Sequence, residues 1–223
     1  MVSAGDLVRR YVGPADVPGS LAARARTARW EEFLRRFPDL SSMRVLDLGG
    51  WPQEWVARPV RPAQVVTVNL EDLPPVPESE PWLVSLYGDA CELPDSIRSE
   101  RFDLVYSNSV LEHVGGHARR LAFAENVHSA ADHHWVQTPY RYFPIEPHWV
   151  FPAFQFLPMR TRVAVSRRWP IGPSPHTADP DVAFVDVSWV ELLGITEMRA
   201  YFPDSTIWRE RFAGLTKSIV ATR

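Results

Sequence analysis

The residues best suited to chemistry are two pairs that each place a carboxylate near an imidazole. Glu112 directly precedes His113, and Glu146 stands two residues before His148. Histidine titrates near neutral pH and is the side chain that most often removes a proton from a reacting group. A neighbouring carboxylate can orient the imidazole or bind hydroxyl groups of a substrate. We therefore interpret His113 and Glu112 as candidate catalytic residues, with the alternative that the pair only holds its own loop in place.

A second set of candidate residues stands where short apolar runs end. The run Val45-Leu46-Asp47-Leu48 leads into a glycine turn, and three further runs follow along the chain. Glycine lets a ligand approach the backbone closely, and a polar residue about 20 positions beyond such a turn is well placed for ribose hydroxyls. Asp47 alone could cap a helix and Asp89 alone could form a turn, but several such ends in order favour a ligand site. The residues at these ends are Asp47, Gly49, Gly50, Trp51, Asn69, Glu71, Asp89, Ala90, Ser107 and Asn108.

The elements that must position these residues alternate between strands and helices. The spacing of apolar residues predicts a helix from Ser20, its N-cap, to Phe37, preceded by a loop with one short helix over 1–19. The Trp/Phe stripe of the predicted helix is expected to pack against a sheet. Strands are predicted over 43–48, 65–70, 82–87, 101–107 and 134–138, with a helix over 116–131. This alternation predicts a parallel sheet with helices on both faces, in which ligands bind at the carboxyl ends of the strands.

The segment 139–185 breaks this alternation because it is long, apolar and rich in proline and aromatic residues. We interpret it as an insert beside the site. Aromatic faces flanked by a few hydrogen-bonding groups suit a sugar or another polyhydroxylated ring, and a hydrophobic lid or a dimer contact is the alternative. A helix is predicted over 186–200, and a closing pair of strands over 205–211 and 217–222. The candidate substrate-binding residues of the insert are Tyr140, Arg141, Glu146 and His148.

Four segments resemble class I S-adenosylmethionine (SAM) dependent methyltransferases. VLDLGG at 45–50 resembles their first motif, and FDLVYSNSVLEHV at 102–114 resembles their fourth. VQTPYRYFPIEPHW at 136–149 and GLTKSIVA at 214–221 are similar to a bacterial, actinobacterial-type subgroup. The resemblance covers about residues 43–222. It implies an α/β, Rossmann-like fold with a seven-stranded, mostly parallel sheet whose last strand is antiparallel.

The resemblance also implies SAM as methyl donor and S-adenosylhomocysteine (SAH) as product. In this reading Asp47 holds the amino-acid end of SAM, Asn69 or Glu71 binds the ribose, and Asp89 accepts from the adenine amino group. The turn Gly49-Gly50-Trp51 approaches the cofactor, Ala90 offers its amide, and Ser107 and Asn108 lie beside the sulfonium. Two positions depart from the pattern: Trp51 replaces a third glycine, and Asn69 replaces an acidic residue. The full G-x-G-x-x-G turn of a nicotinamide-dependent dehydrogenase is absent, which disfavours that class.

The composition narrows the class of protein and its partners. The chain has 223 residues, 45% of them hydrophobic, and a net charge of −3 with a pI near 6.2, which argues against a nucleic-acid partner. A single cysteine, Cys91, excludes an internal disulfide, and no apolar run reaches the roughly 18 residues of a membrane span. We expect a cytoplasmic monomer or homodimer that binds a small molecule, without membrane insertion. Early arginines, interleaved with acids, are interpreted as a solvated helix face: Arg9, Arg10, Arg24, Arg26, Arg29, Arg35 and Arg36.

We therefore expect one methyltransferase domain over 1–223. It would comprise an N-terminal helical cap (1–42), a SAM-binding core (43–138), a substrate-side insert (139–185) and a C-terminal helix with strands (186–223). The expected reaction is O-methylation of a small acceptor, a sugar or glycoside, with His113 as general base; actinobacterial sugar methyltransferases, including the type that acts on methylmannose polysaccharide precursors, are candidate relatives. The alternatives are a lipid or quinone-like acceptor, and a SAM-binding partner subunit without activity. Some sugar methyltransferases use Mg²⁺, but no carboxylate cluster with distinctive ligand spacing is visible, so the metal stays open.

Overall fold

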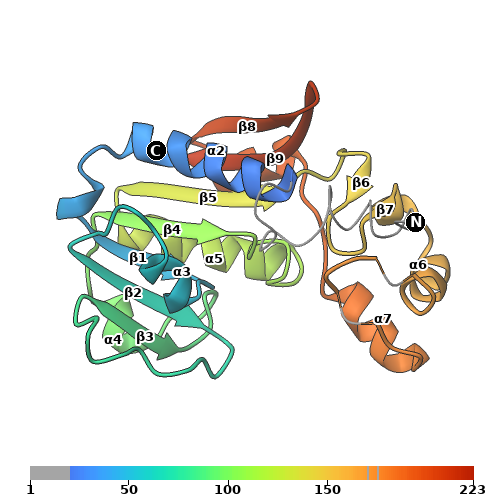
Figure 1. Ribbon diagram of the computed structural model, residues 1–223, viewed down its shortest axis with the longest axis horizontal. Coiled ribbons are helices and arrows are strands. Elements are labelled where there is room, and N and C mark those ends of the chain that lie inside the picture. Colours follow the sequence, from blue (N-terminus) through green and yellow to red (C-terminus); the bar gives the residue numbers. More distant parts are fainter. Residues whose placement is uncertain (1–20, 170, 175) are drawn as a thin grey trace, which may run out of the picture.

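The computed structural model describes residues 21–169, 171–174 and 176–223. The expected short helix within 1–19 and the N-cap at Ser20 lie outside the described residues. The described chain builds a seven-stranded sheet in the order β3-β2-β1-β4-β5-β9-β8 (Figure 1). Sequence order reverses at β1, which has β2 on one side and β4 on the other, so the carboxyl ends of β1 and β4 flank the point where open α/β sheets bind ligands.

Five parallel strands carry the predicted ligand-binding ends. Their bounds are Arg44–Leu48 (β1), Gln64–Asn69 (β2), Leu83–Tyr87 (β3), Leu104–Asn108 (β4) and His133–Pro139 (β5). β9 (Leu215–Thr222) pairs antiparallel with β5, and β8 (Thr206–Phe212) pairs antiparallel with β9. The prediction of a mostly parallel sheet closed by an antiparallel last strand is confirmed.

Helices cover both faces of the sheet, as predicted. α2 (Leu21–Arg36) lies on one face, where Trp30 and Phe33 pack with Val45 and Trp135 of the strands. α5 (His117–Ala130) lies on the opposite face, where its Phe123 belongs to a second core cluster. Successive strand residues such as Val45 and Leu46 enter different clusters because side chains alternate across a strand. The Trp/Phe stripe predicted for the first helix therefore packs against the sheet.

The helix predicted over 186–200 is wrong as a single helix. α7 (Pro180–Ser188) ends early, and α8 (Ile195–Tyr201) begins seven positions later. The residues between them run extended beside the end of β5, where Leu193 forms a bridge with Tyr140 and accepts a hydrogen bond from the Arg141 amide. Backbone pairing with a distant segment thus replaces the helical hydrogen bonds there. The remaining helices among the described residues are α3 (Pro52–Val56), α4 (Asp95–Arg98), α6 (Met159–Ser166) and the 3-10 turns Leu40–Ser42 and Phe154–Phe156.

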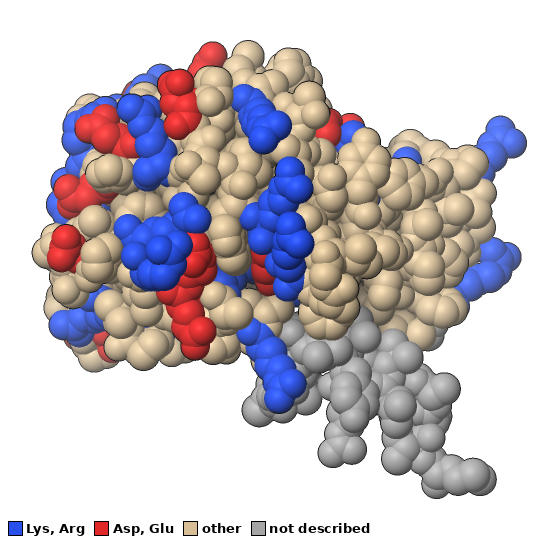
Figure 2. All heavy atoms as spheres, turned by 90° about the horizontal axis from the view of Figure 1, so that it is seen from above, with Lys and Arg blue, Asp and Glu red and all other residues tan. Residues whose placement is uncertain are grey.

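The insert lies beyond the carboxyl ends of the parallel strands (Figure 1). It contains the short pair β6 (Ile145–Glu146) and β7 (Phe151–Pro152), then α6 and α7. Trp149 and Phe154 stack in the insert's own small core, with ring centroids 4.4 Å apart. Figure 2 shows Lys and Arg interleaved with Asp and Glu over the sheet end of one face, and few charges over the insert end. No helix in the described ranges is both long and apolar enough to cross a membrane.

Candidate functional site

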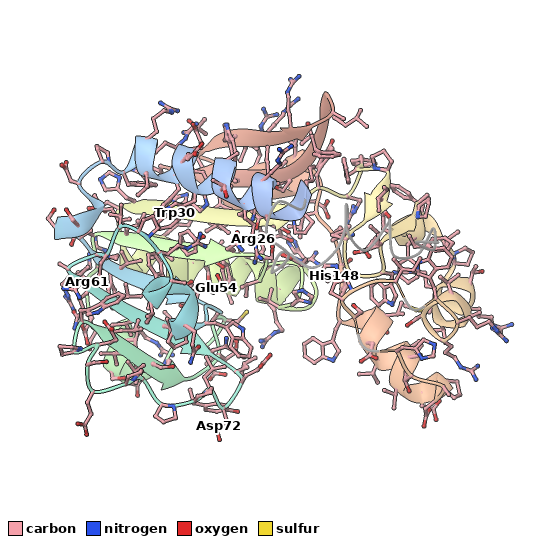
Figure 3. All side chains as sticks on the ribbon, viewed as in Figure 1. Arg26, Trp30, Glu54, Arg61, Asp72 and His148 are labelled. Carbon is pink, nitrogen blue, oxygen red and sulfur yellow. The ribbon has the colours of Figure 1, made fainter. Side chains whose placement is uncertain are left out.

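The two carboxylate–histidine pairs meet at the carboxyl edge of the sheet. Glu112 and His113 follow β4, and Glu146 and His148 come from the insert. The Nε2 atoms of His113 and His148 lie 3.1 Å apart, and His148 Nδ1 donates to Glu146 Oε1 at 2.6 Å. In Figure 3, His148 lies between the end of the sheet and the insert. The fold thus joins two pairs that are 35 residues apart into one cluster, which we call the Glu/His cluster (Glu112, His113, Glu146 and His148).

Fixed contacts hold both carboxylates of the Glu/His cluster. Thr138 on β5 donates its hydroxyl to Glu112 Oε2 at 2.9 Å, and the Trp149 amide donates to Glu146 Oε2 at 2.9 Å. Both glutamates are buried, and Glu112 Oε1 has no hydrogen-bond partner among the described residues. A buried carboxylate oxygen left without a partner is costly, so this atom marks a place where a ligand would be stabilising.

The electrostatic surroundings shift the pKa values of the two imidazoles in opposite directions. Burial, aided by neighbouring His148, lowers the pKa of His113 to about 4. For His148 burial works against the charged form, but the Glu146 carboxylate outweighs it and raises the pKa. Burial also raises the pKa of Glu112. The two shifts favour His148 as the donor and His113 as the acceptor of the hydrogen bond between their Nε2 atoms.

The glycine turn after β1 is shaped by Asp47. Gly49 has a φ of 80°, and a Cβ on Gly50 would lie 1.7 Å from Asp47 Oδ2, so only glycine fits above this carboxylate. Trp55 donates its indole N–H to Asp47 Oδ2 at 2.7 Å, whereas Oδ1 has no partner among the described residues. Burial raises the pKa of Asp47 to about 7. Trp51, the departure from the family pattern, is half-exposed as the N-cap of α3.

The Asn69 side chain is engaged within the protein. Its amide donates to the carbonyls of Gly49 and Gly50 at 3.0 and 3.2 Å, and its oxygen accepts from the Glu71 amide at 3.0 Å. Asn69 therefore ties the end of β2 to the glycine turn. Glu71 is exposed at the same edge, so of the two candidates for a ribose it is the one with a solvent-accessible side chain.

Asp89 lies at the end of β3 beside Arg119 of α5. Arg119 Nη2 donates to both carboxylate oxygens, at 2.9 and 2.7 Å, and the Cys91 amide donates to Oδ1 at 2.8 Å. Burial opposes ionisation, but Arg119 and the Cys91 amide together hold the pKa of Asp89 below its usual value. Ala90 is buried, and its carbonyl accepts from Asn126 at 3.0 Å.

Ser107 and Asn108 end β4 and are both held by other elements. Ser107 donates to the Leu48 carbonyl at 2.9 Å, and Asn108 Oδ1 accepts from Arg29 Nη1 of α2 at 2.6 Å. Arg29 also pairs with buried Glu210 of β8 at 2.9 Å. The interpretation of the early arginines as a solvated face is wrong for Arg29, which is buried because it joins α2 to two strands. The position of Arg29 among the other arginines of the sequence did not indicate that it joins α2 to the sheet.

Tyr140 and Arg141 are placed by the same extended segment that separates α7 from α8. Arg141 Nε donates to the Leu192 carbonyl at 2.7 Å, and its guanidinium pairs with Glu197 at 3.0 Å. The Tyr140 amide donates to the Lys217 carbonyl at 3.0 Å. Arg141 therefore helps to join the insert boundary to α8, and it is not part of the Glu/His cluster.

Known proteins share the architecture of this chain but not its sequence. The sequence matches no protein-family model and no curated protein. The methyltransferase domain of bacterial CtHen1-C is 11% identical, with a TM-score of 0.55 over 89% of this chain and 97% of that chain. The DhpI–SAH complex is 13% identical, with a TM-score of 0.52 over 96% and 90% of the two chains. A protein described as a Zn-dependent alcohol dehydrogenase from Rhodobacter sphaeroides is 9% identical, with a TM-score of 0.58 over 86% of each chain.

Identities this low establish architecture and leave activity open, and the names of these three structures do not agree on an activity. Two of the three are methyltransferase-type structures by their descriptions or their bound SAH. The strand order and the antiparallel β9 agree with the fold that the sequence motifs imply. The chain therefore has the Rossmann-like fold found in methyltransferases.

Proposed function

We propose that the protein is a SAM-dependent methyltransferase that transfers a methyl group to a hydroxyl of a small acceptor, of the sugar or glycoside class. The observation that carries the proposal is the Glu/His cluster, which lies at the edge of the sheet where this fold binds ligands. A hydroxyl is a poor nucleophile until its proton is removed, and the cluster supplies groups suited to that removal.

The residues around the glycine turn suit SAM. Gly50 presents bare backbone above Asp47, whose Oδ1 has no partner among the described residues, and Glu71 offers an exposed carboxylate for ribose hydroxyls. Asp89 and Ala90 lie at the end of the neighbouring strand, where adenine would lie. The structure solved with SAH, DhpI, supports the same cofactor. When bound, SAM supplies a methyl group already activated by a positive sulfur.

The two imidazoles of the Glu/His cluster have different roles toward the acceptor hydroxyl. An acceptor hydroxyl would replace the hydrogen bond between the two Nε2 atoms, donating to His113 and accepting from the N–H of His148. The O–H proton passes to His113, whose burial keeps it neutral, while His148, held by Glu146, stabilises the developing negative charge on oxygen. Bound SAM would supply the methyl carbon to which the oxygen bonds, and its sulfur would keep the electrons of the broken C–S bond.

The packing of the insert supports a polar acceptor. Trp149 and Phe154 are buried in the insert's own core and do not line an apolar tunnel.

One observation favours the second candidate, a lipid or quinone-like acceptor. The outward side of α7 and its C-cap exposes about half of each of four large apolar side chains: Val182, Phe184, Val185 and Trp189.

The proposal is tested by SAM carrying a labelled methyl group, incubated with the protein and a cell extract and then partitioned between water and organic solvent. We expect label in small molecules of the aqueous fraction. Label in the organic fraction would instead support the lipid or quinone-like acceptor. SAM binding measured by calorimetry without any transfer, in extracts from several sources, would favour the non-catalytic partner subunit. A protein that neither binds SAM nor transfers the label would refute the proposal.

Gly172→Ala should lower turnover by about 10- to 100-fold without weakening SAM binding. A Cβ at Gly172 would lie 2.2 Å from the His148 carbonyl oxygen and 2.4 Å from Trp149 Cα, and these backbone atoms can yield only by moving the segment that carries His148. Displacing a reacting group by about 1 Å can cost about 100-fold in rate. Gly116→Ala is the matched control, since nothing lies within 4 Å of its added Cβ. Unchanged turnover in Gly172→Ala would show that the position of His148 does not matter for the reaction.

A further inference from the structure

We propose that Glu112, His113 and His148 bind a divalent transition-metal ion such as Zn²⁺. Each residue offers one ligand atom, and these three atoms all lie within 4.8 Å of one another. In the described part of the chain, no other group of three such residues comes together in this way. The binding of the ion is independent of the proposed function, whereas its catalytic consequence rests on that function.

His148 is held as metal-ligating histidines usually are, and its free nitrogen faces that of His113. In metal sites the distal ring nitrogen of a ligating histidine commonly donates to a carboxylate or a backbone carbonyl, which fixes the ring and its tautomer. His148 Nδ1 donates to Glu146 in this way. The Nε2 atoms then face each other at 3.1 Å. Two nitrogens bound to a tetrahedral Zn²⁺ at the usual bond length lie about 3.3 Å apart, so little movement is needed.

Glu112 supplies the third ligand without giving up a contact. Its Oε2 is held by Thr138 at 2.9 Å, and its Oε1, fully buried, has no partner among the described residues. A cation beside Oε1 would satisfy this atom and neutralise the buried charge. Glu146 differs from Glu112 because both of its oxygens already accept hydrogen bonds, from His148 and from the Trp149 amide. Glu146 is therefore a positioning residue for His148.

The ligand set selects the type of ion. Two imidazoles and one carboxylate suit zinc, iron or cobalt, whereas magnesium prefers oxygen ligands. Three protein ligands leave a coordination position open, as in catalytic zinc sites. An acceptor hydroxyl in that position would lose its proton to solvent more readily, because the ion stabilises the resulting oxyanion. Both histidines would then act as ligands through Nε2, so His113 would no longer accept the proton and the ion would replace the N–H of His148 in stabilising the oxyanion.

The test uses tag-free protein stripped of metal with a chelator. Co²⁺ is titrated and followed by its visible absorption, and Zn²⁺ by calorimetry. We expect one ion per chain, loss of the Co²⁺ bands in His148→Ala and in Glu112→Gln, and a 10- to 100-fold weaker affinity in Glu146→Gln through the lost support of His148. His133→Ala, an exposed histidine at the other end of β5, should bind like the wild type.

Two outcomes would overturn the site. One is the absence of stoichiometric binding in the wild type. The other is unchanged binding in both His148→Ala and Glu112→Gln, with circular dichroism showing that these variants are folded. Methyl transfer assayed with and without metal separates this proposal from the function: transfer by the metal-free protein at the full rate would leave the metal no catalytic role, and metal binding without any transfer would count against the function alone.

Discussion

His113→Ala should lower the turnover of methyl transfer by about 10²- to 10⁴-fold, the usual contribution of a positioned acid–base group. His113 belongs to the Glu/His cluster, where its Nε2 faces that of His148 at 3.1 Å. Asp47, Glu71 and Asp89, which are proposed to bind SAM, lie at or just beyond the ends of β1, β2 and β3, so affinity for SAM should be nearly unchanged. The measurement is kcat with the acceptor found in the labelled extract, together with SAM affinity by calorimetry.

The control for this variant is His133→Ala, because His133 is exposed at the amino end of β5 and should leave turnover unchanged. Two results would contradict the catalytic role of His113. Unchanged turnover in His113→Ala would show that His113 takes no part in the reaction. A loss of SAM binding that matches the loss of turnover would favour the alternative reading, in which Glu112 and His113 only hold the loop after β4 and the methionine end of the cofactor.

The sheet was predictable because its strands are short apolar runs that end in glycine or polar residues. Val65 to Val68 are buried and β-branched, and such a run has few alternatives to a buried strand. The segment after Ser188 misled the helix prediction, because its extended form comes from pairing with Arg141, about 50 residues away. Local pattern carries no information on such a partner.

The candidate site was predictable in its members but not in its connections. Both carboxylate–histidine pairs stand out as residue types, yet their meeting depends on how the insert brings His148 against His113, which follows β4. Thr138 and Arg29 gave no signal because their roles come from tertiary contacts with Glu112 and Glu210. The sequence also left open whether Asn69 is available to a ligand. In the structure its side-chain amide donates to the carbonyls of Gly49 and Gly50 in the glycine turn.

Asp47→Asn should stabilise the protein at pH 8 by a few kcal/mol and much less near pH 4. Burial raises the pKa of Asp47 from its ordinary 3.8 to about 7. Between these values the folded state keeps a proton that the unfolded state has released, so the stability of the wild type falls as pH rises through this window. Each unit of pKa difference corresponds to about 1.4 kcal/mol. Asparagine keeps an acceptor for Trp55, carries no charge, and should remove this pH dependence.

The measurement is the free energy of unfolding from denaturant titrations at pH 4.5 and pH 8. Asp95→Asn is the control for the chemical change itself, because the Asp95 side chain is 98% exposed. An equal stability difference for Asp47→Asn at the two pH values would contradict the raised pKa.

The same variant should bind SAM more weakly if the unpartnered Oδ1 of Asp47 contacts the cofactor. Gain in stability together with loss of affinity would explain the buried carboxylate as a ligand-binding group that is kept at the expense of the free protein's stability.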